Sequence, residues 1–192
     1  MSALAQTQPD PQAVTGDLVE LADEIFDRTS PYEGDGLRNH CRRLYHLASL
    51  LMAKEHVAMD PNVAYLVAMV HDLGLVTAQD RGKTYLHRSL ALFERETDGF
   101  DLGGASPELI RECLLFNHRL LPQSGLGPQA ECFRRAVQIE HSRGLLRFGL
   151  DKRDVGEIFR EYPRDNFDRV LVDFTVRTLK REPWTLVKGI FF

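Results

Sequence analysis

The chain has 192 residues, of which 43% are hydrophobic and 27% charged, and its formal net charge at pH 7 is −4. A chain of this length can bury a sizeable core without disulfides or structural metals, and it predicts one domain. The slight excess of acidic residues argues against a general nucleic-acid binder, which would usually be basic.

The cysteines and the N-terminus bear on the compartment. Cys41, Cys113 and Cys132 form no closely spaced pair, as is typical of reduced thiols in an intracellular protein. Residues 1–12 lack the basic and apolar segments of a signal peptide, and no apolar run approaches the roughly 18 residues that span a bilayer. We therefore expect a cytoplasmic protein that binds neither membranes nor nucleic acid.

Apolar residues recur at helical spacing along most of the chain, and the period-two alternation of strands is not sustained anywhere. A polar tail over residues 1–12 precedes an all-α domain over residues 13–192, with seven or eight helices. The predicted helices cover about 12–29, 36–55, 61–74, 84–97, 106–121, 127–148, 151–161 and 166–181. The apolar residues 190–192 are expected to pack on this domain or on a partner subunit in a homodimer.

One predicted helix, which is apolar nearly all round, ends in the pair His71-Asp72. Burying a carboxylate without a partner costs several kcal/mol, so a buried dyad of this kind needs a physical reason. A bound Zn, Fe, Mn or Ni ion is one reason, because imidazole and carboxylate are good ligands for these metals. The alternative is a polar pair that caps the helix end, with Asp72 bonded to the backbone or to an arginine.

Three further histidines, His40, His87 and His118, are assigned to the apolar faces of their helices. Any one of them alone is more simply explained as a core histidine with a hydrogen-bond partner. Together they would each need such a partner, whereas one or two metal ions would account for them all.

This order of residues resembles the HD superfamily of metal-dependent hydrolases, in which a His, a His-Asp dyad and a later Asp bind metal on successive helices. His40 and the stretch AYLVAMVHDLGL around His71-Asp72 match that pattern, over a resemblance that covers about residues 36–150. His87 and His118 stand where some branches carry ligands for a second metal. The HxxRxY pattern at 40–45 is similar to the cyanamide-hydratase-like branch, as more loosely are GLLRFGL at 144–150 and the later EYPRDNF.

The chain departs from the family at the final Asp. That residue usually follows an Ala, but here Ala136 is followed by Val137, which cannot bind metal. Three interpretations stay open: Glu140 replaces the Asp, His141 replaces it, or the site is degenerate. We favour Glu140 as a metal ligand because it keeps the charge. If it does not bind metal, we expect it to pair with one of the neighbouring arginines Arg134, Arg135 and Arg143.

The resemblance implies a hydrolase that uses metal-activated water on a small molecule such as a phosphoester or nucleotide. Asp72 would act at the metal and, in a two-metal site, bridge the ions. A phosphate also needs a cation, for which Arg43 is our first candidate. The other candidates are Lys83, Arg88 and Arg119. The alternatives are a cyanamide-hydratase-like lyase, a di-iron oxygenase, and a binding module that keeps the scaffold without metal.

Overall fold

The computed structural model describes residues 16–77, 84–181 and 183–184, and the secondary structure within these ranges is helical throughout. The elements are α1 (Asp17–Thr29), α2 (Gly36–Lys54), α3 (Pro61–Val70), the 3₁₀ turn η1 (Leu73–Leu75), α4 (Tyr85–Glu96), α5 (Pro107–Phe116), α6 (Pro128–His141), α7 (Lys152–Glu161) and α8 (Phe167–Arg181). This confirms the predicted all-α fold. In the described part of the chain, no helix combines the length and apolar character needed to cross a membrane.

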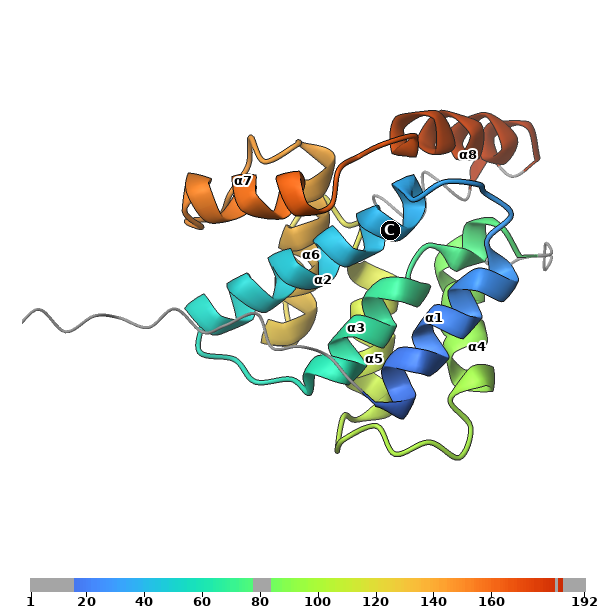
Figure 1. Cartoon of the computed structure of the whole chain (residues 1–192). Helices are drawn as coiled ribbons and strands as arrows, with labels where there is room; N and C mark the ends of the chain where they lie inside the picture. The colour runs from blue at the N-terminus through green and yellow to red at the C-terminus, as the bar shows by residue number, and fades with distance from the viewer. Residues whose placement is uncertain (1–15, 78–83, 182, 185–192) are drawn as a thin grey trace, which may run out of the picture.

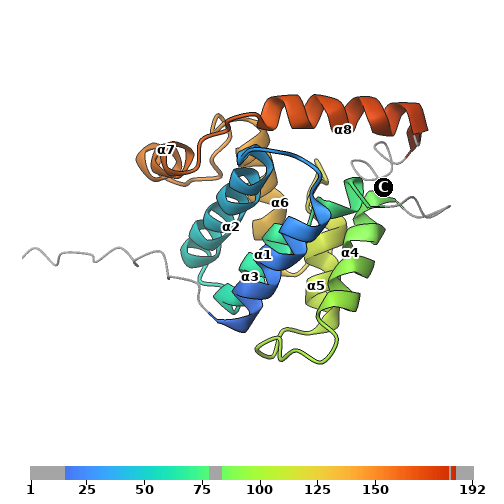
Figure 2. The ribbon, with the colours of Figure 1, turned by 45° about the vertical axis from the view of Figure 1, so that its right-hand side comes forward.

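Two helices form the centre of the fold. α2 contacts α3, α6, α7 and α8, and α3 in turn contacts α1, α4 and α5. α4 and α5 pack on each other on the side away from α7, while α8 lies across one end of the bundle (Figures 1 and 2). Every residue from 63 to 70 in α3 is buried, which explains why this helix is apolar nearly all round.

The start of α3 follows the prediction, but its end does not. Asp60 caps the helix by accepting hydrogen bonds from the backbone N–H groups of Asn62 and Val63. The helix ends at Val70, before Gly74, and the chain continues into η1. A Cβ atom on Gly74 would lie 2.0 Å from the carbonyl oxygen of Tyr85, so this glycine serves the close packing of η1 on α4.

Two other helices are shorter than predicted. α5 ends at Phe116, and the carbonyls of Arg119 and Leu120 instead accept hydrogen bonds from Arg134 on α6. α6 ends at His141, after which Arg143 takes a positive φ of 54°. As a result, His118 and His141 both lie at helix ends, as His71 does.

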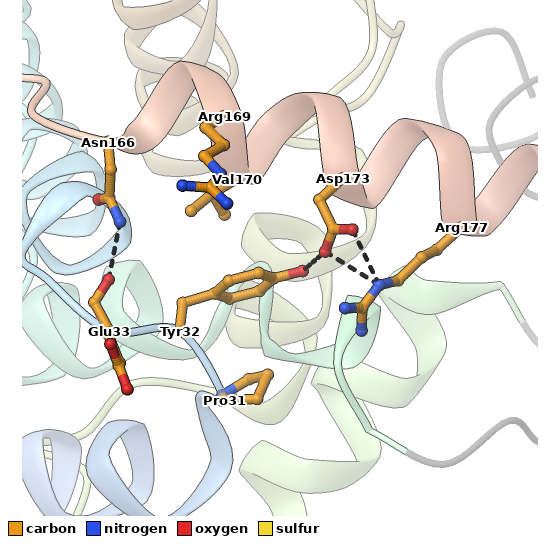
Figure 3. A pocket seen from close by; sticks show the side chains of 8 residues that line it. All are labelled: Pro31, Tyr32, Glu33, Asn166, Arg169, Val170, Asp173 and Arg177. Atoms are coloured by element: carbon orange, nitrogen blue, oxygen red, sulfur yellow. Dashed lines mark hydrogen bonds and ion pairs between the residues drawn. The ribbon is translucent and has the colours of Figure 1, made fainter.

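α8 is held on the connection between α1 and α2 by polar contacts. The Tyr32 hydroxyl donates to Asp173 at 2.5 Å, and Arg177 pairs with the same carboxylate at 2.9 Å (Figure 3). At the start of α8, the Asn166 amide donates to the carbonyl of Glu33 at 2.7 Å. These residues line a pocket of about 340 Å³.

The cysteines are free, as predicted, and all three are buried. Three sequence predictions lie outside the described residues: the tail over residues 1–12, Lys83, and the apolar residues 190–192.

Candidate metal centre

Three buried side chains from two neighbouring segments converge on one point. The Nε2 atom of His40, on α2, lies 3.2 Å from Nε2 of His71 and 3.3 Å from Oδ2 of Asp72. Nε2 of His71 lies 3.2 Å from the same carboxylate oxygen. His71 and Asp72 occupy the bend between α3 and η1, and α3 packs on α2. We call His40, His71 and Asp72 the HHD cluster.

The spacing and chemistry of the HHD cluster fit a metal ion. Metal–nitrogen distances of about 2.0–2.1 Å place the ligand atoms of a tetrahedral site about 3.4 Å apart, close to the separations found here. Two imidazole lone pairs and a carboxylate oxygen that face one another repel unless a proton or a cation lies between them. The cluster could therefore hold a metal ion.

Two features prepare the HHD cluster for a cation. Nδ1 of His71 lies 2.7 Å from the carbonyl of Ala68, to which it donates, so the Nε2 lone pair is left to face the cluster. Burial disfavours the charged form of Asp72, but His71 and His118 outweigh it and hold the pKa of this carboxyl well below its usual range. Asp72 is thus ionised at neutral pH, as a ligand must be.

Two further histidines complete a ring of four imidazoles. His118 lies 3.0 Å from Oδ1 of Asp72, the oxygen that does not face His40 and His71. The exposed His141 has its ring centre 5.6 Å from that of His118 and 5.7 Å from that of His40. Its Nδ1 lies 3.1 Å from the carbonyl of Val137, to which it donates, so Nε2 is left as an acceptor. Of the two proposed substitutes for the missing Asp, His141 is the one beside the cluster on its exposed side.

The inward orientation predicted for His87 is wrong. His87 is exposed, together with Ala91 and Glu94, so these three residues form an exposed row along α4. The buried face of α4 instead carries residues such as Leu86 and Phe93. Nδ1 of His87 lies 2.8 Å from the Thr84 hydroxyl. The structure does not bring it to the HHD cluster.

Glu140 is fully buried, but it lies on the far side of the His40 ring and does not face the HHD cluster. Its Oε2 is 3.0 Å from Nδ1 of His40, on the opposite side of the ring from Nε2. Its Oε1 accepts from Arg43 at 2.6 Å and from Arg164 at 2.7 Å. The expectation that Glu140 replaces the missing ligand is therefore not met, and its arginine partners are not the ones predicted from neighbouring positions.

Arg43 is not placed to contact a substrate. Its side chain is fully buried, and its donors are bonded to Glu140 and to the carbonyls of Tyr162 and Pro163. It lies one turn after His40 on α2, and it donates two hydrogen bonds to Oε1 of Glu140. This corrects its predicted catalytic role. Arg88 is also buried and donates to the carbonyl of Gly74. The guanidinium of Arg119 lies over Phe116, with its ring centre 5.2 Å away, and its Nε has no hydrogen-bond partner among the described residues.

The sequence did not predict two residues after α7, one of which contacts His40 and the other Glu140. Phe167 stacks on the imidazole of His40 with ring centres 4.2 Å apart and an interplanar angle of 10°. Arg164 reaches Glu140 from the same segment. Both residues lie in the EYPRDNF stretch at 161–167, which the loose resemblance to the cyanamide-hydratase-like branch includes.

Comparison of the chain with protein-family models and with curated proteins gives no match. The fold and the HHD cluster together define an all-α protein with a buried group able to bind a metal ion.

Proposed function

We propose that this protein is a metal-dependent hydrolase of the HD type, with His40, His71 and Asp72 as the metal ligands. The observation that carries the proposal is the mutual approach of the three ligand atoms, at 3.2–3.3 Å, in a buried setting. His71 and Asp72 adjoin each other in the chain, and the approach of His40 from α2 completes a set of ligands that sequence order alone does not bring together.

Two imidazole nitrogens and one carboxylate oxygen suit Zn, Fe, Mn or Ni. Three protein ligands leave at least one position for water, as catalytic sites require. A divalent ion bound there would lower the pKa of a coordinated water toward neutrality and supply a nucleophile at pH 7. We propose one ion per chain, because the HHD cluster is the group of suitable spacing among the described residues and His87 lies outside it.

The surrounding side chains have roles that follow from their contacts. His118 donates to Oδ1 of Asp72 and so holds the carboxylate with Oδ2 toward His40 and His71. His141 is exposed beside the cluster, with its Nε2 left as an acceptor. We assign it the role of general base for a proton of the attacking water.

The two candidate substrate classes differ in whether they need a cationic side chain to contact a phosphate. A phosphoester or nucleotide is our first candidate. We assign its phosphate to Arg119, whose Nε has no hydrogen-bond partner among the described residues. A second candidate is the addition of water to a small nitrile-type molecule. It is supported by the bonding of Arg43, whose buried guanidinium donates to Glu140 and to two backbone carbonyls and not toward a substrate. Such a substrate needs a small pocket and no cation.

The test is elemental analysis of the untagged protein after incubation with Mn, Fe, Ni and Zn salts. We expect about one ion per chain in the wild type, and its loss in His71→Ala and Asp72→Ala. His87→Ala, which removes an exposed imidazole, is the matched control and keeps its metal. Phosphoester and nitrile panels then decide the substrate class. A folded wild type that takes up no metal would overturn the proposal in favour of a binding module, and two iron ions per chain would favour an oxygenase.

A further inference from the structure

The segment that joins α7 to α8 is bound closely to the turns of α2 that carry His40. The carbonyl of Pro163 accepts from Asn39 at 3.1 Å, and that of Tyr162 accepts from Arg43 at 2.7 Å. The backbone N–H of Gly36 donates to Asn166 at 3.0 Å. A Cβ atom on Gly36 would lie 2.2 Å from the Asn166 side-chain oxygen, so the close approach depends on glycine. We call residues 162–167 the strap.

The strap and α6 together build an ionic group behind His40. Oε1 of Glu140 accepts from Nε and Nη2 of Arg43 and from Nη1 of Arg164, which is a strap residue. A fully buried carboxylate that is paired with two guanidinium groups therefore lies on the Nδ1 side of a proposed metal ligand.

The other oxygen of Glu140 faces His40. Oε2 lies 3.0 Å from Nδ1 of His40, and neither atom has a hydrogen-bond partner among the described residues. The pair meets the distance of a hydrogen bond but not its angle, so a small rotation would align it. One face of the same imidazole is covered by Phe167 of the strap.

We propose that Glu140, held by Arg43 and the strap residue Arg164, is a positioning residue that makes His40 a metal ligand through Nε2. A carboxylate beside Nδ1 favours the tautomer that carries its proton there, which leaves the Nε2 lone pair toward His71 and Asp72. The stacked Phe167 resists rotation of the ring out of this orientation. The carbonyl of Ala68 favours the same tautomer of His71, because it accepts a hydrogen bond from Nδ1 of that ring. This inference rests on the proposed metal site.

The experiment measures binding of Zn²⁺ and Co²⁺ alone to the metal-free full chain, by competition with a chromogenic chelator. Glu140→Gln keeps the shape and removes the charge, and we expect a loss of Zn²⁺ affinity of about 10–100-fold. Glu140→Asp restores the charge and recovers part of the affinity. Arg164→Gln gives a smaller loss. The matched control is Arg143→Gln. The Arg143 side chain pairs with Asp168 at 3.0 Å near the same segment, and only its backbone N–H, which the substitution keeps, donates to the carbonyl of Glu140.

Two additional measurements separate positioning from general destabilisation. Circular dichroism shows whether each metal-free variant is folded, and Arg164→Gln keeps the test valid if Glu140→Gln does not fold. The visible spectrum of bound Co²⁺ reports the coordination geometry, and we expect it to change in Glu140→Gln but not in Arg143→Gln.

The outcomes distinguish this inference from the function on which it rests. A folded Glu140→Gln that binds Zn²⁺ like the wild type, with an unchanged Co²⁺ spectrum, overturns the positioning role and leaves the metal site standing. Equal losses in Arg164→Gln and Arg143→Gln also overturn it, because the cause would then be surface charge. A folded wild type that binds neither ion overturns the metal site itself.

Discussion

The Nε2 atoms of His40 and His71 lie 3.2 Å apart, although the two residues are separated by 31 positions in the chain. At this distance two imidazole lone pairs need a proton or a cation between them. The other nitrogen of each ring faces a separate oxygen, from Ala68 for His71 and from Glu140 for His40. Both rings therefore present the same atom to the same point, where a cation would bind.

Metal binding is expected to stabilise the fold. A ligand that binds only the native state at about 100 times its dissociation constant adds about 2.7 kcal/mol to the free energy of unfolding. For a chain of this size, that corresponds to a rise in Tm of about 5–10 °C. We expect this rise with Zn²⁺ in differential scanning calorimetry and its loss with EDTA. The Tm of His71→Ala should not rise with Zn²⁺. A wild type whose Tm does not change on addition of Zn²⁺ would contradict the prediction.

The number of ions is tested at His118. In the one-ion arrangement, His118→Ala keeps the metal but binds it about tenfold more weakly, because Oδ1 of Asp72 loses the partner that orients the carboxylate. Metal titration followed by elemental analysis measures both quantities. Two ions in the wild type and one in His118→Ala would show instead that His118 is a ligand of a second ion.

Two glycines provide a paired test of packing. In Gly74→Ala the new Cβ would meet the Tyr85 carbonyl oxygen at 2.0 Å and the Ser89 backbone nitrogen at 2.6 Å. Because these are backbone atoms, we expect a loss of about 3 kcal/mol or more in the free energy of unfolding. Gly156, within α7, has no atom within 4 Å of such a Cβ, and Gly156→Ala should stabilise the protein by about 0.5–1 kcal/mol. Urea unfolding measures both, and equal effects would argue against the close packing of η1 on α4.

Arg43 is predicted to matter for stability through its buried partners. Arg43→Met leaves Glu140 with Arg164 as its remaining arginine partner and removes the donors to Tyr162 and Pro163. Breaking a buried ion pair from one side costs about 3–5 kcal/mol. The control is Arg153→Met, in an exposed pair with Glu157 on α7, which should change stability by less than about 0.5 kcal/mol. Similar values for the two variants would contradict a buried structural role for Arg43.

Helix positions were largely predictable, whereas three helix ends were not. The spacing of apolar residues and the Asp60-Pro61 start are local signals, and the structure follows them. The ends of α3, α5 and α6 depend on contacts with other segments or on the local turn. Gly74 packs on α4, side chains of α6 bind the carbonyls after α5, and Arg143 turns left-handed after α6. Periodicity does not contain this information.

His87 on α4 and Glu140 on α6 show what the assignment of a residue to a helix face does not predict. His87 shares a face with Leu90 and Ala91, which predicts an inward side chain, yet Ala91 is itself exposed. Glu140 is buried on the inward face of α6. However, a helix face does not specify which of the two nitrogens of His40 the carboxylate will meet.

The residue order by itself determined the all-α class and the burial of His71-Asp72, and it made His40 a candidate metal ligand. These predictions depend on short-range periodicity or on the free-energy cost of burying a charged group. Only the tertiary structure decided that His141 lies beside the cluster and that Glu140 lies behind His40. It also revealed that the strap supplies Phe167 and Arg164. These relationships join residues up to about 127 positions apart, and the direction in which a side chain presents its atoms across such a contact depends on how the helices pack.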